Sequence, residues 1–79
     1  MFLEIVTPEK TLYSNDVKYV NIPGSNGKFG VLKNHAPVIS TMQKGQIKVV
    51  EKDDKELFFD VNGGVVEVLK NNIIVLAKL

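Results

Sequence analysis

The stretch QIKVVEKDDKELFFDVN, residues 46–62, decides the fold, because it is the longest run without proline or glycine and therefore the best candidate for a helix. Its apolar residues alternate with polar ones through QIKVVE and again through ELFFDV, which is the period of a β-strand rather than of a helix. Asp53 and Asp54 stand between the two halves and are typical turn residues. The stretch therefore predicts a β-hairpin that turns near Asp53 and Asp54.

The same alternation extends over almost the whole chain. It is present in FLEIV, DVKYVNI and VVEVLK, while IIVLA near the end is apolar on both faces and is expected to fill the core. Turn signals separate these segments at short, fairly even spacing: TPEK, SND, PGSNG, KNHAP, QKG, KDDK, NGG and KNN. Short strands at this spacing predict an all-β fold, a flattened sandwich or barrel in two sheets, as a single domain over residues 1–79.

The composition excludes several classes of protein. With 44% hydrophobic and 24% charged residues, the 79-residue chain is predicted to form one globular domain. Its net charge is only +1, and its ten basic residues are scattered lysines, which argues against nucleic acid as a partner. The chain has no cysteine, no zinc motif, no apolar run long enough for a bilayer and no secretory leader. These features predict a cytoplasmic protein without a metal site.

The segment IPGSNGKFG, residues 22–30, has glycines spaced somewhat like a phosphate-binding loop. In a true phosphate loop the lysine is followed by a serine or threonine, but Phe29 follows Lys28 here, and no helix is expected next. Pro23 and Gly24 open a turn, and Asn26 and Gly27 suit a tight hairpin. We interpret the segment as a hairpin with no bound cofactor.

The sequence offers no catalytic constellation. His35 is the only histidine and there is no cysteine, so a nucleophile, a base and an orienting acid cannot be assembled in a familiar pattern. Asp53, Asp54 and Glu56 belong to the predicted hairpin tip, and Glu67 is expected to point outward from a strand. His35, in KNHAPV, is interpreted from these residues as a structural hydrogen-bonding side chain. No enzyme is predicted.

Three segments in collinear order resemble one family. The run SNGKFGVLKNHAPVIS is similar to the hallmark segment of the epsilon subunit of F-type (proton-translocating) ATP synthases. LEIVTPEKTLYSNDVKYVNIPG resembles the opening of that family, and FFDVNGGVVEVLKNNIIVLA resembles the closing strands, so that the resemblance covers nearly all 79 residues.

The resemblance implies a β-sandwich of about ten short strands and a non-catalytic role in the central stalk, or rotor. One copy per complex would couple the gamma subunit to the membrane c-ring, so that proton flow drives ATP synthesis. The subunit would be peripheral to the membrane, at the cytoplasmic face of the bacterial inner membrane or its organellar equivalent.

The resemblance also assigns two sets of contact residues. The positions that lie on the gamma-facing side of the family are Thr7, His35 and Ser40. The positions that approach the c-ring are Gly27, Lys28 and Phe29. Met42 is expected to add apolar surface for the gamma subunit, since it ends the segment VISTM.

The chain departs from the family pattern in three places. Lys28 stands where the family is often acidic, and Asn34 stands where it usually has glycine, although asparagine tolerates left-handed backbone geometry. The family commonly continues into two C-terminal helices that inhibit ATP hydrolysis, whereas this sequence ends at Leu79, so neither that inhibition nor ATP binding is expected.

Two rival functions come from other classes. A free-standing small β-barrel that binds nucleic acid or sugar is the main alternative, but such sites stack their ligands on aromatic side chains, and this chain has two tyrosines and no tryptophan. A small enzyme that uses the glycine loop is the second, and nucleotide binding lost on changing Lys28 would support it.

Overall fold

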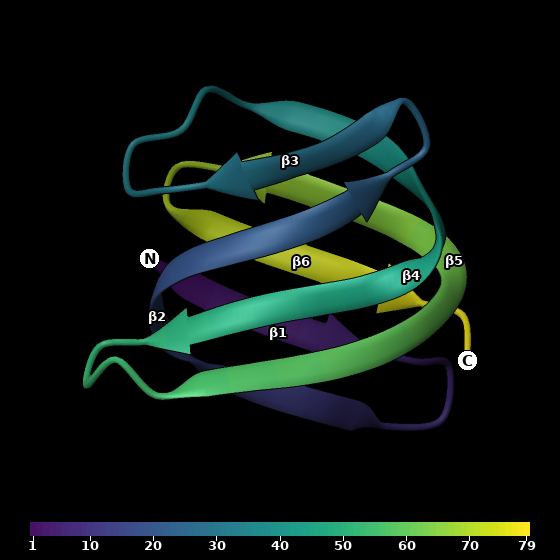
Figure 1. Ribbon diagram of the computed structural model, residues 1–79, viewed down its shortest axis with the longest axis horizontal. Coiled ribbons are helices and arrows are strands. Elements are labelled where there is room, and N and C mark those ends of the chain that lie inside the picture. Colours follow the sequence, from purple (N-terminus) through teal and green to yellow (C-terminus); the bar gives the residue numbers. More distant parts are fainter.

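The structure, a computed structural model, describes all 79 residues and contains six β-strands and no helix (Figure 1). The strands are β1 (Phe2–Val6), β2 (Thr11–Gly24), β3 (Gly27–Val31), β4 (Val38–Glu51), β5 (Glu56–Leu69) and β6 (Asn72–Ala77). The all-β prediction is confirmed. The stretch that was the best candidate for a helix forms the predicted β4–β5 hairpin, whose turn includes Asp54 with a positive φ of 70°.

The sheet closes on itself. Its strand order is β1-β6-β5-β4-β2-β3, and β1 also pairs with β2, so that five strands form a closed ring and β3 extends it at one edge. All pairings are antiparallel except β1 with β6, in which Phe2 stands opposite Asn72 and Val6 opposite Leu76. Figure 1 shows β1 and β6 side by side behind β2 and β4. The two ends of the chain therefore complete the fold together.

The expectation of about ten short strands is wrong, because β2, β4 and β5 are each 14 residues long and contribute to both layers. In β5 the bend between the layers falls at Gly63 and Gly64, whose φ angles are 122° and 135°. The ladder with β4 continues on both sides of the bend, from Lys44 opposite Asn62 to Met42 opposite Gly64. Glycine lets the strand change direction while the pairing with β4 resumes in the same register beyond the bend, so two expected short strands are one long strand.

A single hydrophobic core fills the space between the layers, and no polar or charged side chain is buried in it. The core residues are Leu3, Ile5, Val17, Val20, Ile22, Val31, Met42, Ile47, Val49, Val61, Val66, Val68, Ile73, Val75 and Ala77. Most follow the predicted alternation. Val17 and Val20 are both buried although they are three positions apart, because the pairing of β2 with β4 shifts register between Val17 and Tyr19.

Candidate interaction surface

One side of the closed sheet carries six exposed apolar side chains on four neighbouring strands. It lies on β1, β6, the second half of β5 and the first half of β4, where these residues stand opposite one another in successive rows of the ladder. We call this surface the outer face; its exposed apolar residues are Phe2, Ile39, Val65, Leu69, Ile74 and Leu76. Ile39 is 72% exposed and Leu76 is 54% exposed. Exposed apolar side chains gathered on several adjacent strands are typical of a surface that meets a partner.

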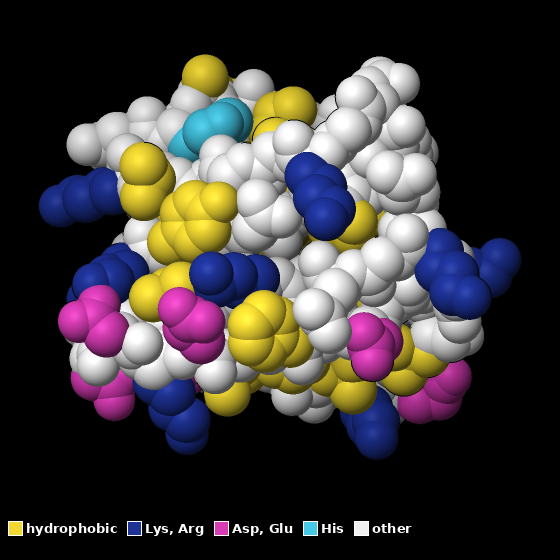
Figure 2. Space-filling view, viewed as in Figure 1, with side chains coloured by type: hydrophobic (Ala, Val, Ile, Leu, Met, Phe, Trp, Pro, Cys, Tyr) yellow, Lys and Arg dark blue, Asp and Glu magenta, His cyan; other side chains and the backbone are white.

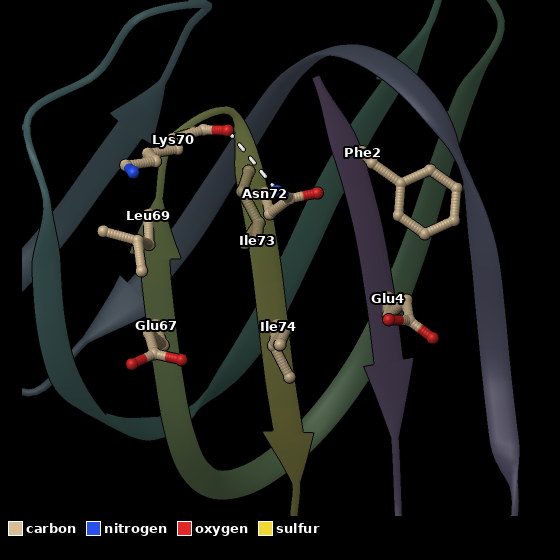
Figure 3. Close-up of a pocket in the computed structure, with 8 residues that line it drawn as sticks. All are labelled: Phe2, Glu4, Glu67, Leu69, Lys70, Asn72, Ile73 and Ile74. Atoms are coloured by element: carbon tan, nitrogen blue, oxygen red, sulfur yellow. Dashed lines mark hydrogen bonds between the residues drawn. The ribbon is translucent and has the colours of Figure 1, made fainter.

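The middle row of the outer face carries two carboxylates. Glu4 of β1 stands opposite Ile74 of β6, which stands opposite Glu67 of β5, and Ile39 of β4 is the next residue in the row. Figure 3 shows Glu67, Ile74 and Glu4 in one line across three neighbouring strands. A shallow hollow of about 380 Å³ covers this part of the face. Glu67 is exposed, as its place in the strand alternation predicts.

The opposite layer has a different surface. Figure 2 shows the side formed by β2, β3 and the adjoining halves of β4 and β5, where lysines and carboxylates surround separate hydrophobic side chains. Lys48 pairs with Glu56 at 3.7 Å, and Lys18 pairs with Asp54. Phe58 is 52% exposed, but its ladder partner is Lys48. Only the outer face is therefore apolar over several adjacent strands.

Thr7 lies beside the outer face, whereas the side chain of Ser40 lies on the other side of β4, the side that carries the buried Met42. Thr7 follows β1 and shapes the turn into β2, since its Oγ1 accepts hydrogen bonds from the backbone N–H groups of Glu9 at 3.3 Å and Lys10 at 3.2 Å. Ser40 lies on β4 next to Ile39, is half-buried, and donates its hydroxyl to the carbonyl of Thr41 at 2.9 Å. Their hydrogen bonds are local, so both side chains have a structural role within the chain.

His35 lies in the loop between β3 and β4, which is tied to the β5–β6 turn. The backbone N–H of Asn34 donates to Asn71 Oδ1 at 2.7 Å, and Asn71 Nδ2 donates to Asn34 Oδ1 at 3.2 Å. Both asparagines have positive φ angles, 66° and 63°, which confirms the left-handed geometry predicted for Asn34. The His35 Nδ1 lies 2.7 Å from the carbonyl oxygen of Ala36. This pair of asparagines holds the histidine loop against the end of the outer face.

The expectation that Met42 offers surface to a partner is wrong. Met42 is 5% exposed and belongs to the core, because the residues of β4 that point outward here are Ile39 and Thr41. The expectation that IIVLA fills the core on both sides is also wrong. Ile74 and Leu76 of that segment point outward. In VISTM, the exposed apolar residue is Ile39 rather than the expected Met42. In the sequence, the sign of surface exposure at Ile39, Ile74 and Leu76 was an apolar residue at a position where the alternation predicts a polar one.

The glycine segment forms the predicted hairpin. β2 and β3 turn at Ser25 and Asn26, and Gly27 follows with a φ of 126°, whereas the φ of Asn26 is not positive. Gly27 and Lys28 are exposed at the tip, while Phe29 is half-buried and packs against the core. The tip is joined to β4, because the N–H of Ser25 donates to the Thr41 carbonyl at 2.9 Å. The c-ring residues assigned by the resemblance thus occupy one hairpin.

The side chains of the chain show no arrangement typical of catalysis. No group of three or more His, Cys, Asp or Glu residues could hold a metal ion. One titratable group is clearly perturbed: burial, together with the hydrogen bond that its hydroxyl donates to Glu51, raises the pKa of Tyr13 to about 12. Asn15 also donates to the same Glu51 oxygen, at 3.0 Å. This cluster joins β2 to β4 and is explained by the stability of the fold.

The family follows from a match over the whole chain. A family model described as "ATP synthase, Delta/Epsilon chain, beta-sandwich domain" matches residues 1–79. The chain belongs to this family. The resemblance found in the three sequence motifs is therefore confirmed, and the six strands described above are those of an epsilon-type β-sandwich domain.

Individual relatives agree with the family match. An ATP synthase epsilon chain from Campylobacter hominis is 41% identical over 79 residues, which is 99% of this chain and 61% of the relative. The epsilon chain from Protochlamydia amoebophila is 40% identical over 75 residues, which is 95% of this chain and 51% of the relative. The epsilon-type domain thus spans about half to three fifths of the length of these curated relatives.

Solved structures support the fold. A chain in the cryo-EM structure of the Euglena gracilis mitochondrial ATP synthase, OSCP/F1/c-ring, superposes with a TM-score of 0.90 at 18% identity, covering 95% of this chain and 48% of that chain. A chain in the Tetrahymena thermophila mitochondrial ATP synthase, central stalk/c-ring, gives 0.82 at 16% identity, covering 100% and 63%. The epsilon-type domain described here contains no helix that could cross a lipid bilayer.

Proposed function

We propose that this chain is a non-catalytic subunit of the central stalk of an F-type ATP synthase, where it joins the gamma subunit to the membrane ring of c subunits. One copy per complex would act at the membrane surface, peripheral and on the cytoplasmic side in a bacterium, so that proton flow through the ring drives ATP synthesis. The family match supports the assignment to this complex. The chain itself performs no chemistry in this proposal.

The closed sheet suits a part that transmits torque. Five strands form a ring around a core without buried polar groups, and 48 backbone hydrogen bonds hold a chain of 79 residues together. Close-packed interiors have low compressibility, so such a body passes on force with little deformation. A shaft and a rotor ring clamped to two of its surfaces would therefore turn together.

The outer face is the observation that carries the proposal. It is the part of the surface where exposed apolar side chains are found on four neighbouring strands, and Thr7 and the His35 loop lie beside it. The side chain of Ser40 lies on the other side of β4 from Ile39, so its contact with the gamma subunit rests on the resemblance alone. We assign this face to the gamma subunit. Met42 is not part of the assignment because it is buried in the core.

The β2–β3 hairpin is assigned to the c-ring. Gly27 and Lys28 stand exposed at its tip, and Phe29 supports the tip by packing against the core. The bond from Ser25 to Thr41 fixes the hairpin to β4, the strand that also carries Ile39 of the outer face. The two assigned contacts are thus connected through one strand, which suits a coupling role.

Capture experiments with purified gamma subunit and with detergent-solubilised c-ring test these assignments. Ile39→Asp places a charge on the outer face and is expected to reduce capture of gamma at least tenfold, whereas Phe58→Asp, at a similarly exposed residue of the opposite layer, should leave it unchanged. Lys28→Glu should weaken capture of the c-ring, whereas Lys52→Glu, in the β4–β5 turn, should leave it unchanged. A wild-type chain that captures neither gamma nor the ring would refute the proposed function.

A further inference from the structure

The two carboxylates of the outer face have no partner within the chain. Glu4 and Glu67 take part in none of the side-chain hydrogen bonds of the structure, and no lysine nitrogen lies within 4.0 Å of either, since the two ion pairs are Lys18 with Asp54 and Lys48 with Glu56. Five other acids do have partners; Glu51, for example, accepts hydrogen bonds from Tyr13 and Asn15. Neither carboxylate is therefore paired within the chain.

The surroundings of these carboxylates are apolar. Ile74 stands between them in the ladder, and Ile39 follows Glu67 in the same row. The two carboxylates belong to strands separated by one intervening strand, so their Cα atoms are about 10 Å apart by the ordinary spacing of strands. In Figure 3 both side chains border the hollow over Ile74, and Lys70 lies at its other end, near the turn. An incoming side chain placed over Ile74 would thus lie within reach of two carboxylates.

A partner that covered this face must compensate the charges of both Glu4 and Glu67. A purely apolar partner would remove two carboxylates from water without compensation, which is strongly unfavourable. A second copy of this chain in a symmetric dimer would add its own two carboxylates to the interface, and a membrane with anionic headgroups would be repelled. A polypeptide surface that carries one cationic side chain among apolar ones would compensate the two carboxylates and cover the apolar residues.

We infer that the outer face recognises its partner through a single arginine or lysine that seats over Ile74 between Glu4 and Glu67, with apolar side chains of the partner covering the remainder. The inference rests on the proposed function, which makes the gamma subunit that partner. An arginine suits the position best, because its planar guanidinium has five N–H donors and forms paired hydrogen bonds with carboxylates. The apolar residues supply contact area, and the two carboxylates set the position and orientation of the partner.

The test is a salt series of binding measurements between the full chain and purified gamma subunit, with a double variant Glu4→Gln, Glu67→Gln. This variant keeps the size of both side chains and one acceptor oxygen on each but removes both charges. We expect at least a tenfold increase in Kd at low salt and a weaker dependence of Kd on salt than in the wild type. The double variant Glu56→Gln, Asp60→Asn neutralises two acids of the opposite layer and should match the wild type. Unchanged thermal unfolding of both variants shows that they are folded.

The outcomes separate the two proposals. If wild-type chain binds gamma and the Glu4, Glu67 double variant binds with the same Kd and the same salt dependence, the inference is overturned and the proposed function stands. If the wild-type chain binds no gamma, the proposed function falls and this inference with it. Loss of binding in both double variants to the same extent would also overturn the inference, because overall charge would then explain the effect.

Discussion

Replacing Gly64 by alanine should disrupt the bend at which β5 passes from one layer to the other. Gly64 has a φ of 135°, and a Cβ at this position would meet the backbone of β6, colliding with the carbonyl oxygen of Leu76 and lying 3.2 Å from the Cα of Ala77. It would also lie 3.0 Å from Met42 Cε, but that is the end of a flexible side chain and can move. The backbone of β6 cannot move without weakening its pairing with β5 and β1.

The adjacent Gly63 provides a matched control. Its φ is 122°, so alanine is strained there as well, but the nearest atom to its Cβ is the Met42 carbonyl oxygen at 3.3 Å. A strained backbone angle costs on the order of 1–3 kcal/mol, which is the loss of stability expected for Gly63→Ala. Gly64→Ala adds the collision with β6, so we expect a loss above about 4 kcal/mol, in the range that only a specific structural defect produces.

These free energies translate into large shifts of the unfolding temperature. With an unfolding entropy of about 2.1 cal/mol/K per residue, 1 kcal/mol corresponds to about 6 °C for a chain of this length. Thermal and urea unfolding followed by far-ultraviolet circular dichroism should therefore show Gly63→Ala about 6–18 °C below the wild type, and Gly64→Ala more than 20 °C below it or unfolded. The reasoning would be refuted if Gly64→Ala unfolded at the same temperature as Gly63→Ala.

Three further predictions concern single features of the fold. In a double-mutant cycle, Asn34→Ala and Asn71→Ala should show a coupling free energy of about 1 kcal/mol for the hydrogen bond from Asn71 Nδ2 to Asn34 Oδ1, because the other bond uses the backbone N–H of Asn34, which alanine keeps. Additive losses would contradict the side-chain bond. The pKa of Tyr13 is about 12 in the folded chain rather than the ordinary 10.0. The stability that the Tyr13 hydroxyl contributes is therefore complete below pH 10 and is lost as the pH rises through 12. In unfolding measurements over this pH range, Tyr13→Phe should lose stability less steeply than the wild type. Ile73→Ala should lower the free energy of unfolding by about 2–5 kcal/mol, since Ile73 is 1% exposed. Ile74→Ala, on the outer face, should lower it by less than about 1 kcal/mol. Equal losses in chemical denaturation would mean that Ile74 belongs to the core.

The sequence by itself determined the class of fold and the family. A period of two in the apolar residues is a local property, because successive side chains of a strand point to opposite faces. It identified the β4–β5 hairpin and the division of FLEIV into one side with Leu3 and Ile5 and another with Phe2, Glu4 and Val6. The three motifs led to the epsilon-type family, which the match over residues 1–79 confirms. Turn chemistry likewise predicted the left-handed geometry of Asn34.

Only the tertiary structure decided which faces are covered and how the sheet closes. Alternation shows that Ile39 and Thr41 share one side and Ser40 and Met42 the other, but not which side meets the core. The strand IIVLA reads as apolar throughout, yet only the parallel pairing of β1 with β6 settles which of its sides faces out. Such pairings join residues about 70 positions apart, as with Phe2 and Asn72, and depend on how the whole chain packs. A pattern along the chain specifies the sides of each strand, whereas burial is a property of the assembled layers.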